Sequence, residues 1–128
     1  MIRRVLSMPG AFGFVVRDSA EGSVIGFALG RVVREECELL SIGVAPNHRS
    51  HGYGAQLLKA TIVRATFEKA KKLFLEVAED NEVALKLYAD HGLVAVGRRP
   101  DYYQHEGGRA TAALTMRCDL PAATSDKG

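Results

Sequence analysis

The sequence has no tryptophan, only two cysteines and no long apolar run. No apolar stretch approaches the roughly 20 residues that a membrane-spanning helix needs. The N-terminal apolar stretch is too short for a signal peptide. Without tryptophan, and with tyrosine and phenylalanine scattered along the chain, the sequence shows no platform on which nucleic-acid bases would stack. We therefore expect a cytoplasmic protein that binds neither a membrane nor nucleic acid directly.

The chain also lacks a strong excess of charge. Its 17 Lys and Arg residues face 15 Asp and Glu residues, which leaves a formal net charge of +2. A nucleic-acid-binding protein more often carries a dense basic face. Hydrophobic residues make up 47% of the 128 residues and charged residues 25%, which is typical of a globular protein. We expect a single domain over residues 1–120 and a disordered small, polar tail over 121–128.

The two cysteines, Cys37 and Cys118, stand far apart in the sequence. They form no Cys-x-x-Cys pair, and neither they nor the histidines show the spacing of metal ligands. We predict no metal site. Two buried free thiols are the favoured interpretation, and a structural disulfide is the alternative.

The first half of the chain predicts three strands. Residues 1–8 have the pattern of the end of a helix, which Pro9 and Gly10 would stop. Alternating apolar residues then predict strands over 11–17, 24–34 and 38–44, separated by short polar turns. Short connections of this kind favour an antiparallel meander.

The second half has a different pattern. After a polar, glycine-bearing loop over 45–54, the period becomes helical and then alternates between strand and helix. The expected elements are a helix over 55–72, a strand over 73–77, a helix over 81–90 capped by Asn81, and strands over 93–98 and 110–118. The order is three strands, then helix, strand and helix, then two strands. This order indicates an α+β fold with a mixed sheet.

The loop from Arg49 to Ala55 joins a predicted strand to a predicted helix. Gly52 and Gly54 let the backbone approach an anion, and the unpaired N–H groups and dipole of the helix N-terminus favour negative charge. A pyrophosphate is the natural ligand, which Arg49 can contact. The loop is neither a P-loop nor a dinucleotide-binding fingerprint, since it lacks Gly-Lys-Ser/Thr and a third glycine. An ordinary strand-to-helix turn is the alternative.

This loop resembles the pyrophosphate motif of the GNAT superfamily of N-acetyltransferases, Arg/Gln-x-x-Gly-x-Gly/Ala. Arg49, Gly52 and Gly54 fill its defined positions, and residues 40–46 resemble the bulged fourth strand of that family. A second block of similarity consists of Leu75-Glu76-Val77, Asn81, Ala84, Leu87-Tyr88 and Gly92-Leu93. With Arg98-Arg99 and Tyr102-Tyr103, this block is most similar to bacterial ribosomal-protein-alanine N-acetyltransferases.

The resemblance implies the GNAT fold, with a mixed, mostly antiparallel sheet splayed between its fourth and fifth strands. These strands correspond here to residues 38–44 and 73–77. The first strand and helix of the family are missing, although they normally form one wall of the acceptor groove. A second copy of the chain, in a homo-oligomer, is one way to cover the exposed edge.

The resemblance also implies acetyl-CoA as the acetyl donor and coenzyme A as a product. The residues implied in binding it are Ile42, Gly43, Val44, Arg49, Ser50, His51, Gly52, Tyr53, Gly54, Ala55 and Asn81. Glu76 corresponds to the general base of the family, acting directly or through water, and Tyr88 to the general acid. Tyr102 and Tyr103 belong to the loop that borders the acceptor in similar enzymes, although tyrosine pairs also cap cores.

Glu76 has support from the sequence itself, because it interrupts an otherwise apolar strand. A buried carboxylate is costly unless it is paired or partly protonated, and such an environment suits a general base. The alternative is a glutamate at the sheet edge that faces water or a lysine such as Lys72.

The expected function is therefore transfer of an acetyl group to a primary amine, most similar to acetylation of the N-terminal α-amine of a ribosomal protein. Two alternatives stay open. One is acetylation of a small-molecule amine or a lysine by the same core. The other is an acyl-CoA-binding module with little catalytic activity.

Overall fold

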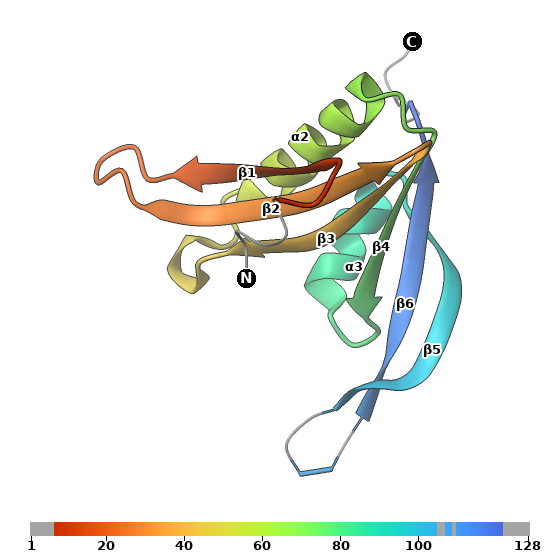
Figure 1. Ribbon diagram of the computed structural model, residues 1–128. Coiled ribbons are helices and arrows are strands. Elements are labelled where there is room, and N and C mark those ends of the chain that lie inside the picture. The colour runs from red at the N-terminus through yellow and green to blue at the C-terminus, as the bar shows by residue number, and fades with distance from the viewer. Residues whose placement is uncertain (1–6, 105–106, 109, 122–128) are drawn as a thin grey trace.

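The computed structural model describes residues 7–104, 107–108 and 110–121. The helix end predicted over 1–8 and the disordered tail predicted over 121–128 lie outside these ranges except for residues 7, 8 and 121. Within the described ranges, the chain forms an α+β fold with a single six-stranded sheet (Figure 1).

The elements follow the predicted order. They are β1 (Ala11–Arg17), β2 (Val24–Val33), β3 (Glu36–Val44), the 3-10 helix η1 (Pro46–His48), α2 (Tyr53–Phe67), β4 (Lys72–Ala78), α3 (Glu82–Asp90), β5 (Val94–Gln104) and β6 (Ala110–Asp119). The strand order in the sheet is β1-β2-β3-β4-β6-β5. All neighbours are antiparallel except β3 and β4, which are parallel. None of the described helices has both the length and the apolar character of a membrane span.

The first three strands form the predicted meander, and α2 packs against one of its faces. Gly26 of β2 permits this close packing, and Gly30 leaves room for the ring of Phe12 on β1. A Cβ atom on Gly26 would stand 3.2 Å from Leu57 of α2, and one on Gly30 would stand 2.6 Å from the Phe12 ring.

The core lies between the sheet and the two α-helices. Its fully buried apolar side chains include Leu57 and Leu58 of α2, Leu73 of β4, and Leu93 just after α3. Cys37 of β3 and Cys118 of β6 both pair with Leu73 in the sheet, one on each side, and both are buried free thiols. The favoured interpretation of the cysteines is confirmed.

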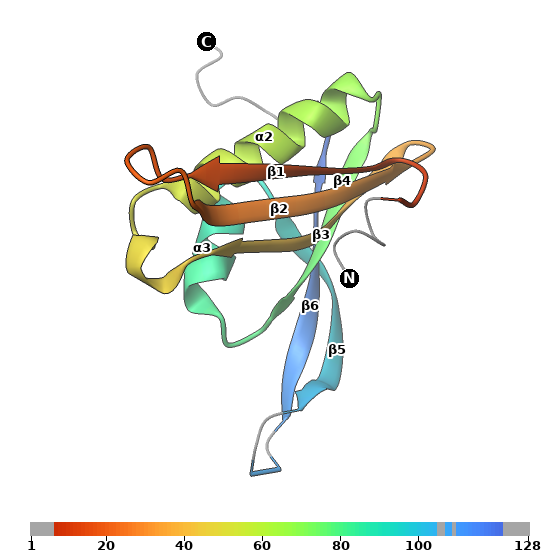
Figure 2. The same cartoon turned by 60° about the vertical axis from the view of Figure 1, so that its left-hand side comes forward.

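Strands β3 and β4 separate soon after they begin. Their pairing covers only Glu36–Glu38 against Lys72–Phe74, and the two strands then diverge. Figures 1 and 2 show β1–β3 leaving in one direction and β4–β6 in another, with α3 beside the opening. The splay expected between residues 38–44 and 73–77 is confirmed, and it leaves one edge of β3 beyond Glu38 without a neighbouring described strand.

Helix α2 ends five residues earlier than predicted. The N–H of Ala70 donates to the carbonyl of Ala65 (3.0 Å), and that of Lys69 donates to the carbonyl of Thr66 (2.9 Å). With Lys69 in the left-handed region (φ 70°), these bonds form a Schellman motif. The prediction of a helix to residue 72 was wrong because a lysine occupies the position at which glycine usually signals the stop.

Strand β5 is longer than predicted. Residues 99–104, expected in a loop, continue the strand to Gln104 through an irregularity in the register between Arg99 and Tyr103. Asp101 adopts a positive φ of 54° within this irregularity. Tyr102 and Tyr103 therefore lie on a strand rather than in a loop, since the bulge accommodates a sequence that contains Pro100.

Candidate active site

A cleft of about 590 Å³ lies where the end of β3 meets the first turns of α2 and one side of α3. It is lined by Ile42, Gly43, Val44, His48, Arg49, Ser50, Gly52, Tyr53, Gly54, Ala55, Asn81, Val83, Ala84, Leu87 and Tyr88. All the residues expected at the donor site except His51 belong to this lining. The fold thus gathers two separate segments of the sequence into one site.

The first turn of α2 faces this cleft without a side-chain cap. Its N-cap, Gly52, adopts a left-handed conformation (φ 82°) that favours glycine, and no side chain accepts a hydrogen bond from the first N–H groups. The first turn contains no acidic residue. Unpaired N–H groups and the positive end of the helix dipole therefore meet at the cleft, which favours an anion such as a phosphate.

The second glycine of the loop keeps this space open. A Cβ atom on Gly54 would stand 3.4 Å from Cδ2 of Leu87, on the facing helix α3. A methyl group fits at that distance, whereas the larger branches of a β-branched side chain would extend into the gap between the helices. The backbone of α2 is thus accessible because residue 54 has no side chain.

The side chain of Arg49 makes a hydrogen bond within the site. Its Nε donates to the carbonyl of Val44 (3.1 Å), so the side chain ties the loop to the end of β3. This bond leaves the terminal nitrogens of the guanidinium to contact an anion. Ile42 and Gly43, on the same strand, belong to the edge that β4 does not pair. Such an edge can accept an extended ligand through backbone hydrogen bonds.

Asn81 caps α3, as predicted. Its Oδ1 accepts a hydrogen bond from the N–H of Ala84 (3.1 Å). The cap begins the helix where it reaches the cleft, so that Ala84, Leu87 and Tyr88 line the wall opposite α2. Asn81 therefore has a structural role in addition to its place in the lining.

The two histidines of the loop lie differently with respect to the cleft. His51 does not belong to the lining, and its ring lies near that of Tyr53 (6.1 Å between centroids), so its part in donor binding stays a prediction. His48 lines the cleft instead. The short helix η1 ends at His48, and the positive φ of Ser50 (67°) turns the loop between the two histidines.

Glu76 is less buried than expected. Leu75 and Val77 point into the core, whereas the side chain of Glu76 points to the opposite face of the sheet and is 33% accessible. Its carboxylate lies 3.5 Å from Nη2 of Arg99, not beside Lys72, which pairs with Asp119. The expectation of burial was wrong because alternation along β4 brings every second residue to the opposite face.

Tyr88 lines the cleft, whereas Tyr102 and Tyr103 lie on β5. Burial raises the pKa of Tyr88, and Tyr103 raises it further. Burial also raises the pKa of Tyr103, as does the charge of Glu76. The Tyr102 ring packs edge-on against Tyr103 (5.0 Å) and lies under the Arg99 guanidinium (4.4 Å). Arg99, Tyr102 and Tyr103 therefore form one cluster on β5.

Comparison with known proteins agrees with this geometry. Residues 3–93 match the model of the acetyltransferase (GNAT) family. The chain belongs to the GNAT acetyltransferase family. Within the described residues, no group of three His, Cys, Asp or Glu side chains could hold a metal ion.

Several GNAT proteins are similar to this chain over most of its length. It is 37% identical to N-alpha-acetyltransferase RimI of Mycobacterium tuberculosis, over 77% of this chain and 61% of that protein. It is 33% identical to the [ribosomal protein bS18]-alanine N-acetyltransferase of Haemophilus influenzae, over 76% and 66%. The crystal structure of the ribosomal-protein-S18-alanine N-acetyltransferase from Escherichia coli superposes with a TM-score of 0.85 at 26% identity, covering 98% of this chain and 79% of that one. The match thus spans less than two thirds of the length of the Mycobacterium tuberculosis and Haemophilus influenzae proteins.

The residues present fit the phosphates and the pantetheine arm that an acyl-CoA would bring to a GNAT domain. The uncapped N-terminus of α2 and the open space at Gly54 suit a pyrophosphate. The unpaired edge of β3 suits an extended amide-bearing arm. These features come from the backbone more than from side chains, which explains why few charged residues are needed.

Proposed function

We propose that this chain is an acetyl-CoA-dependent N-acetyltransferase whose acceptor is the N-terminal α-amine of a protein, with a ribosomal protein as the leading candidate. The observation that carries the donor assignment is the uncapped, glycine-bearing N-terminus of α2 beside the unpaired edge of β3. The acceptor assignment draws on the names of the similar proteins. A ribosomal acceptor would place the reaction in the cytoplasm.

In this proposal, the backbone of Ile42, Gly43 and Val44 binds the pantetheine arm as an added strand would. The residues proposed to bind the rest of the donor are Arg49, Ser50, Gly52, Tyr53, Gly54, Ala55 and Asn81. When bound, acetyl-CoA supplies a thioester carbonyl for attack by the amine. Coenzyme A is the product.

Glu76 is proposed as the general base that takes a proton from the incoming ammonium, directly or through water. Its exposure suits this role, because a carboxylate on the open face of the sheet can pass the proton on to solvent. The acceptor then approaches from that face, where Tyr102 and Tyr103 form one wall. Arg99 holds the carboxylate at the rim of this wall.

Tyr88 is proposed as the general acid that protonates the departing thiolate. It is buried and belongs to the lining of the cleft. Its raised pKa keeps the phenol protonated at neutral pH, as a proton donor must be. The proposed base and acid belong to β4 and α3, and of the two only Tyr88 belongs to the lining of the cleft.

The test is thiol release from acetyl-CoA with peptides that begin with a free alanine, compared with N-blocked peptides that contain lysine. We expect turnover only with the free N-terminus. Turnover only with lysine or with small amines would replace the protein N-terminus with one of those acceptors. Binding of acetyl-CoA without thiol release from any amine would favour a binding module.

Two variants test the catalytic pair. Glu76→Gln and Tyr88→Phe should each lower kcat by about 10²-fold or more while the Kd for coenzyme A stays nearly constant. Glu38→Gln is a matched control, because this residue stands on β3 at the closed end of the splay, away from the cleft. Unchanged turnover in Glu76→Gln would remove this residue from the base role.

A further inference from the structure

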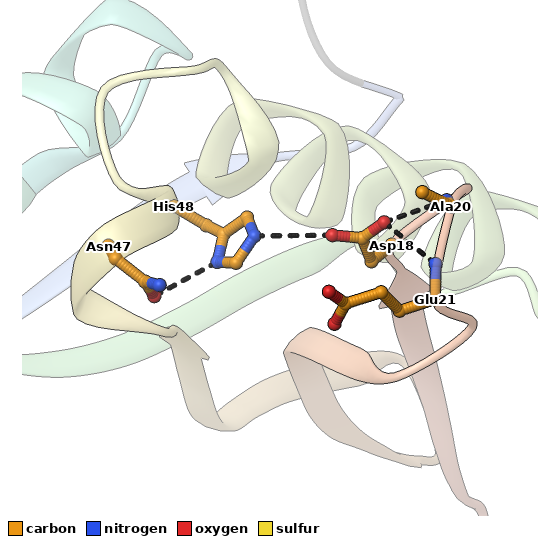
Figure 3. Close-up of polar contacts among 5 residues, drawn as sticks. All are labelled: Asp18, Ala20, Glu21, Asn47 and His48. Atoms are coloured by element: carbon orange, nitrogen blue, oxygen red, sulfur yellow. Dashed lines mark hydrogen bonds and ion pairs between the residues drawn. The ribbon is translucent and has the colours of Figure 1, made fainter.

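The turn between β1 and β2 contacts the loop that precedes α2. Figure 3 shows the Asp18 side chain reaching from this turn to the His48 ring. Oδ2 of Asp18 lies 3.5 Å from Nε2 of His48, and the other ring nitrogen, Nδ1, lies 3.1 Å from Oδ1 of Asn47. Both ring nitrogens of His48 therefore face an oxygen that can accept a hydrogen bond.

Hydrogen bonds within the turn between β1 and β2 hold the side chain of Asp18 in place. Its Oδ1 accepts hydrogen bonds from the N–H groups of Ala20 (2.7 Å) and Glu21 (3.1 Å), as Figure 3 also shows. Two backbone bonds close the same turn, from Asp18 to Ser23 (2.8 Å) and from Gly22 to Asp18 (2.7 Å). The hydrogen bond from Ala20, followed by that from Glu21, lowers the pKa of Asp18, so the carboxylate is charged at neutral pH.

His48 lies in the part of the loop that shapes the cleft. It ends the short helix η1, and its side chain lines the cleft next to Arg49. Beyond it, Ser50 (φ 67°) adopts a left-handed conformation that is unfavourable for a residue with a side chain. A loop with such a conformation needs outside contacts to keep one shape. The bond from Arg49 to Val44 is one such contact, and the contact with Asp18 is another.

We propose that Asp18 is a positioning residue for coenzyme A binding, acting through His48. The contact is shielded, since only about a quarter of each side chain is accessible (25% and 26%). It connects the loop to a hairpin that does not itself line the cleft. This inference rests on the proposed function, because it takes coenzyme A as the ligand of the cleft.

Loss of the contact between Asp18 and His48 should weaken the binding of coenzyme A, although the groups proposed to contact the ligand stay the same. If the loop loses its fixed shape, only a fraction of the molecules is ready to bind, and the apparent Kd rises by the inverse of that fraction. The phosphate end of the ligand depends on this loop. The pantetheine arm depends on β3, whose pairing with β2 is independent of Asp18.

The experiment compares Asp18→Asn, His48→Ala and the double variant. Asparagine keeps an oxygen for the N–H groups of Ala20 and Glu21 but removes the charge that faces His48. Glu21→Gln is the matched control, because it removes a carboxylate from the same turn, and the polar partners of the His48 ring are Asp18 and Asn47 rather than Glu21. Protein-observed NMR titrations measure the Kd for coenzyme A and for pantetheine, which has no phosphates.

We expect each single variant to bind coenzyme A about three- to tenfold more weakly. Pantetheine affinity and the Glu21→Gln control should match the wild type, and the double variant should be no weaker than either single one. Unchanged coenzyme A affinity in Asp18→Asn, additive losses in the double variant, or equal weakening of both ligands would each overturn the proposal. A wild-type chain that does not bind coenzyme A would instead refute the proposed function and the inference that rests on it.

Discussion

Replacement of Gly54 by valine is the most direct test of the donor cleft. The position lies in the first turn of α2, and a Cβ atom there would stand 3.4 Å from Cδ2 of Leu87, which is van der Waals contact. The backbone is helical, so a side chain adds no conformational strain. Valine suits a helix slightly better than glycine, and this gain offsets some crowding. We expect the free energy of unfolding to change by less than about 1 kcal/mol.

The affinity for coenzyme A should change much more in Gly54→Val than the free energy of unfolding does. The two γ-methyl groups of valine would occupy the gap between α2 and Leu87, where we propose that the N–H groups of the first turn bind the phosphates. A hydrogen bond to a charged group contributes about 1.5–3 kcal/mol, so the loss of two such bonds amounts to at least about 3 kcal/mol. This loss corresponds to an increase of about 100-fold or more in the Kd for coenzyme A.

The assay pairs calorimetric titration with coenzyme A and thermal unfolding of the same samples. Gly54→Ala is the control, because a methyl group fits at 3.4 Å and leaves the cleft open. It should bind coenzyme A within a fewfold of the wild type. Both variants should melt within about 5 °C of the wild type. Gly54→Val with wild-type affinity would refute the assignment of the cleft, and a collapse of its melting temperature would refute the separation of binding from folding.

Two further predictions concern the core. Burial raises the pKa of Cys37 to about 11, so the folded protein at pH 8 should react with a chromogenic disulfide reagent only as fast as it unfolds. Fast labelling of the folded protein at pH 8 would contradict the burial of this thiol. For the same reason, the free energy of unfolding should fall as the pH rises from about 8.5, the ordinary pKa of a thiol, through about 11. Leu73 is fully buried, so Leu73→Ala should lower the free energy of unfolding in urea by about 2–5 kcal/mol. Val63 is 68% accessible, and Val63→Ala should change the free energy of unfolding by less than about 0.5 kcal/mol. Equal losses in the two variants would contradict the burial of Leu73 in the core.

Local chemistry made part of this structure predictable. The alternation over residues 24–33 and the short turns beside it indicated the meander, and Asn81 indicated the start of α3. The glycines at 52 and 54 indicated an anion-binding helix start, which the uncapped N-terminus of α2 agrees with. These signals lie within a few residues of the feature that they predict.

Other features escaped prediction because their causes lie elsewhere in the chain or in an unusual residue. Helix α2 stops at a left-handed Lys69, a position where glycine would have been the usual signal. Strand β5 runs through Tyr103 because β6 pairs with it on the far side of an irregularity in the register. The exposure of Glu76 follows from which face of β4 the helices cover.

By itself, the sequence determined the order of the elements and indicated the anion-binding loop, since periodicity and short motifs specify these locally, whereas the candidate acid and base came from the resemblance to a family. Only the tertiary structure decided which residues meet. The early end of the β3–β4 pairing opened the cleft, the turn of the loop brought His48 to it, and Asp18 reached that loop from another hairpin. Contacts between distant segments depend on strand register and on helix packing, and both are settled by burying the whole core at once.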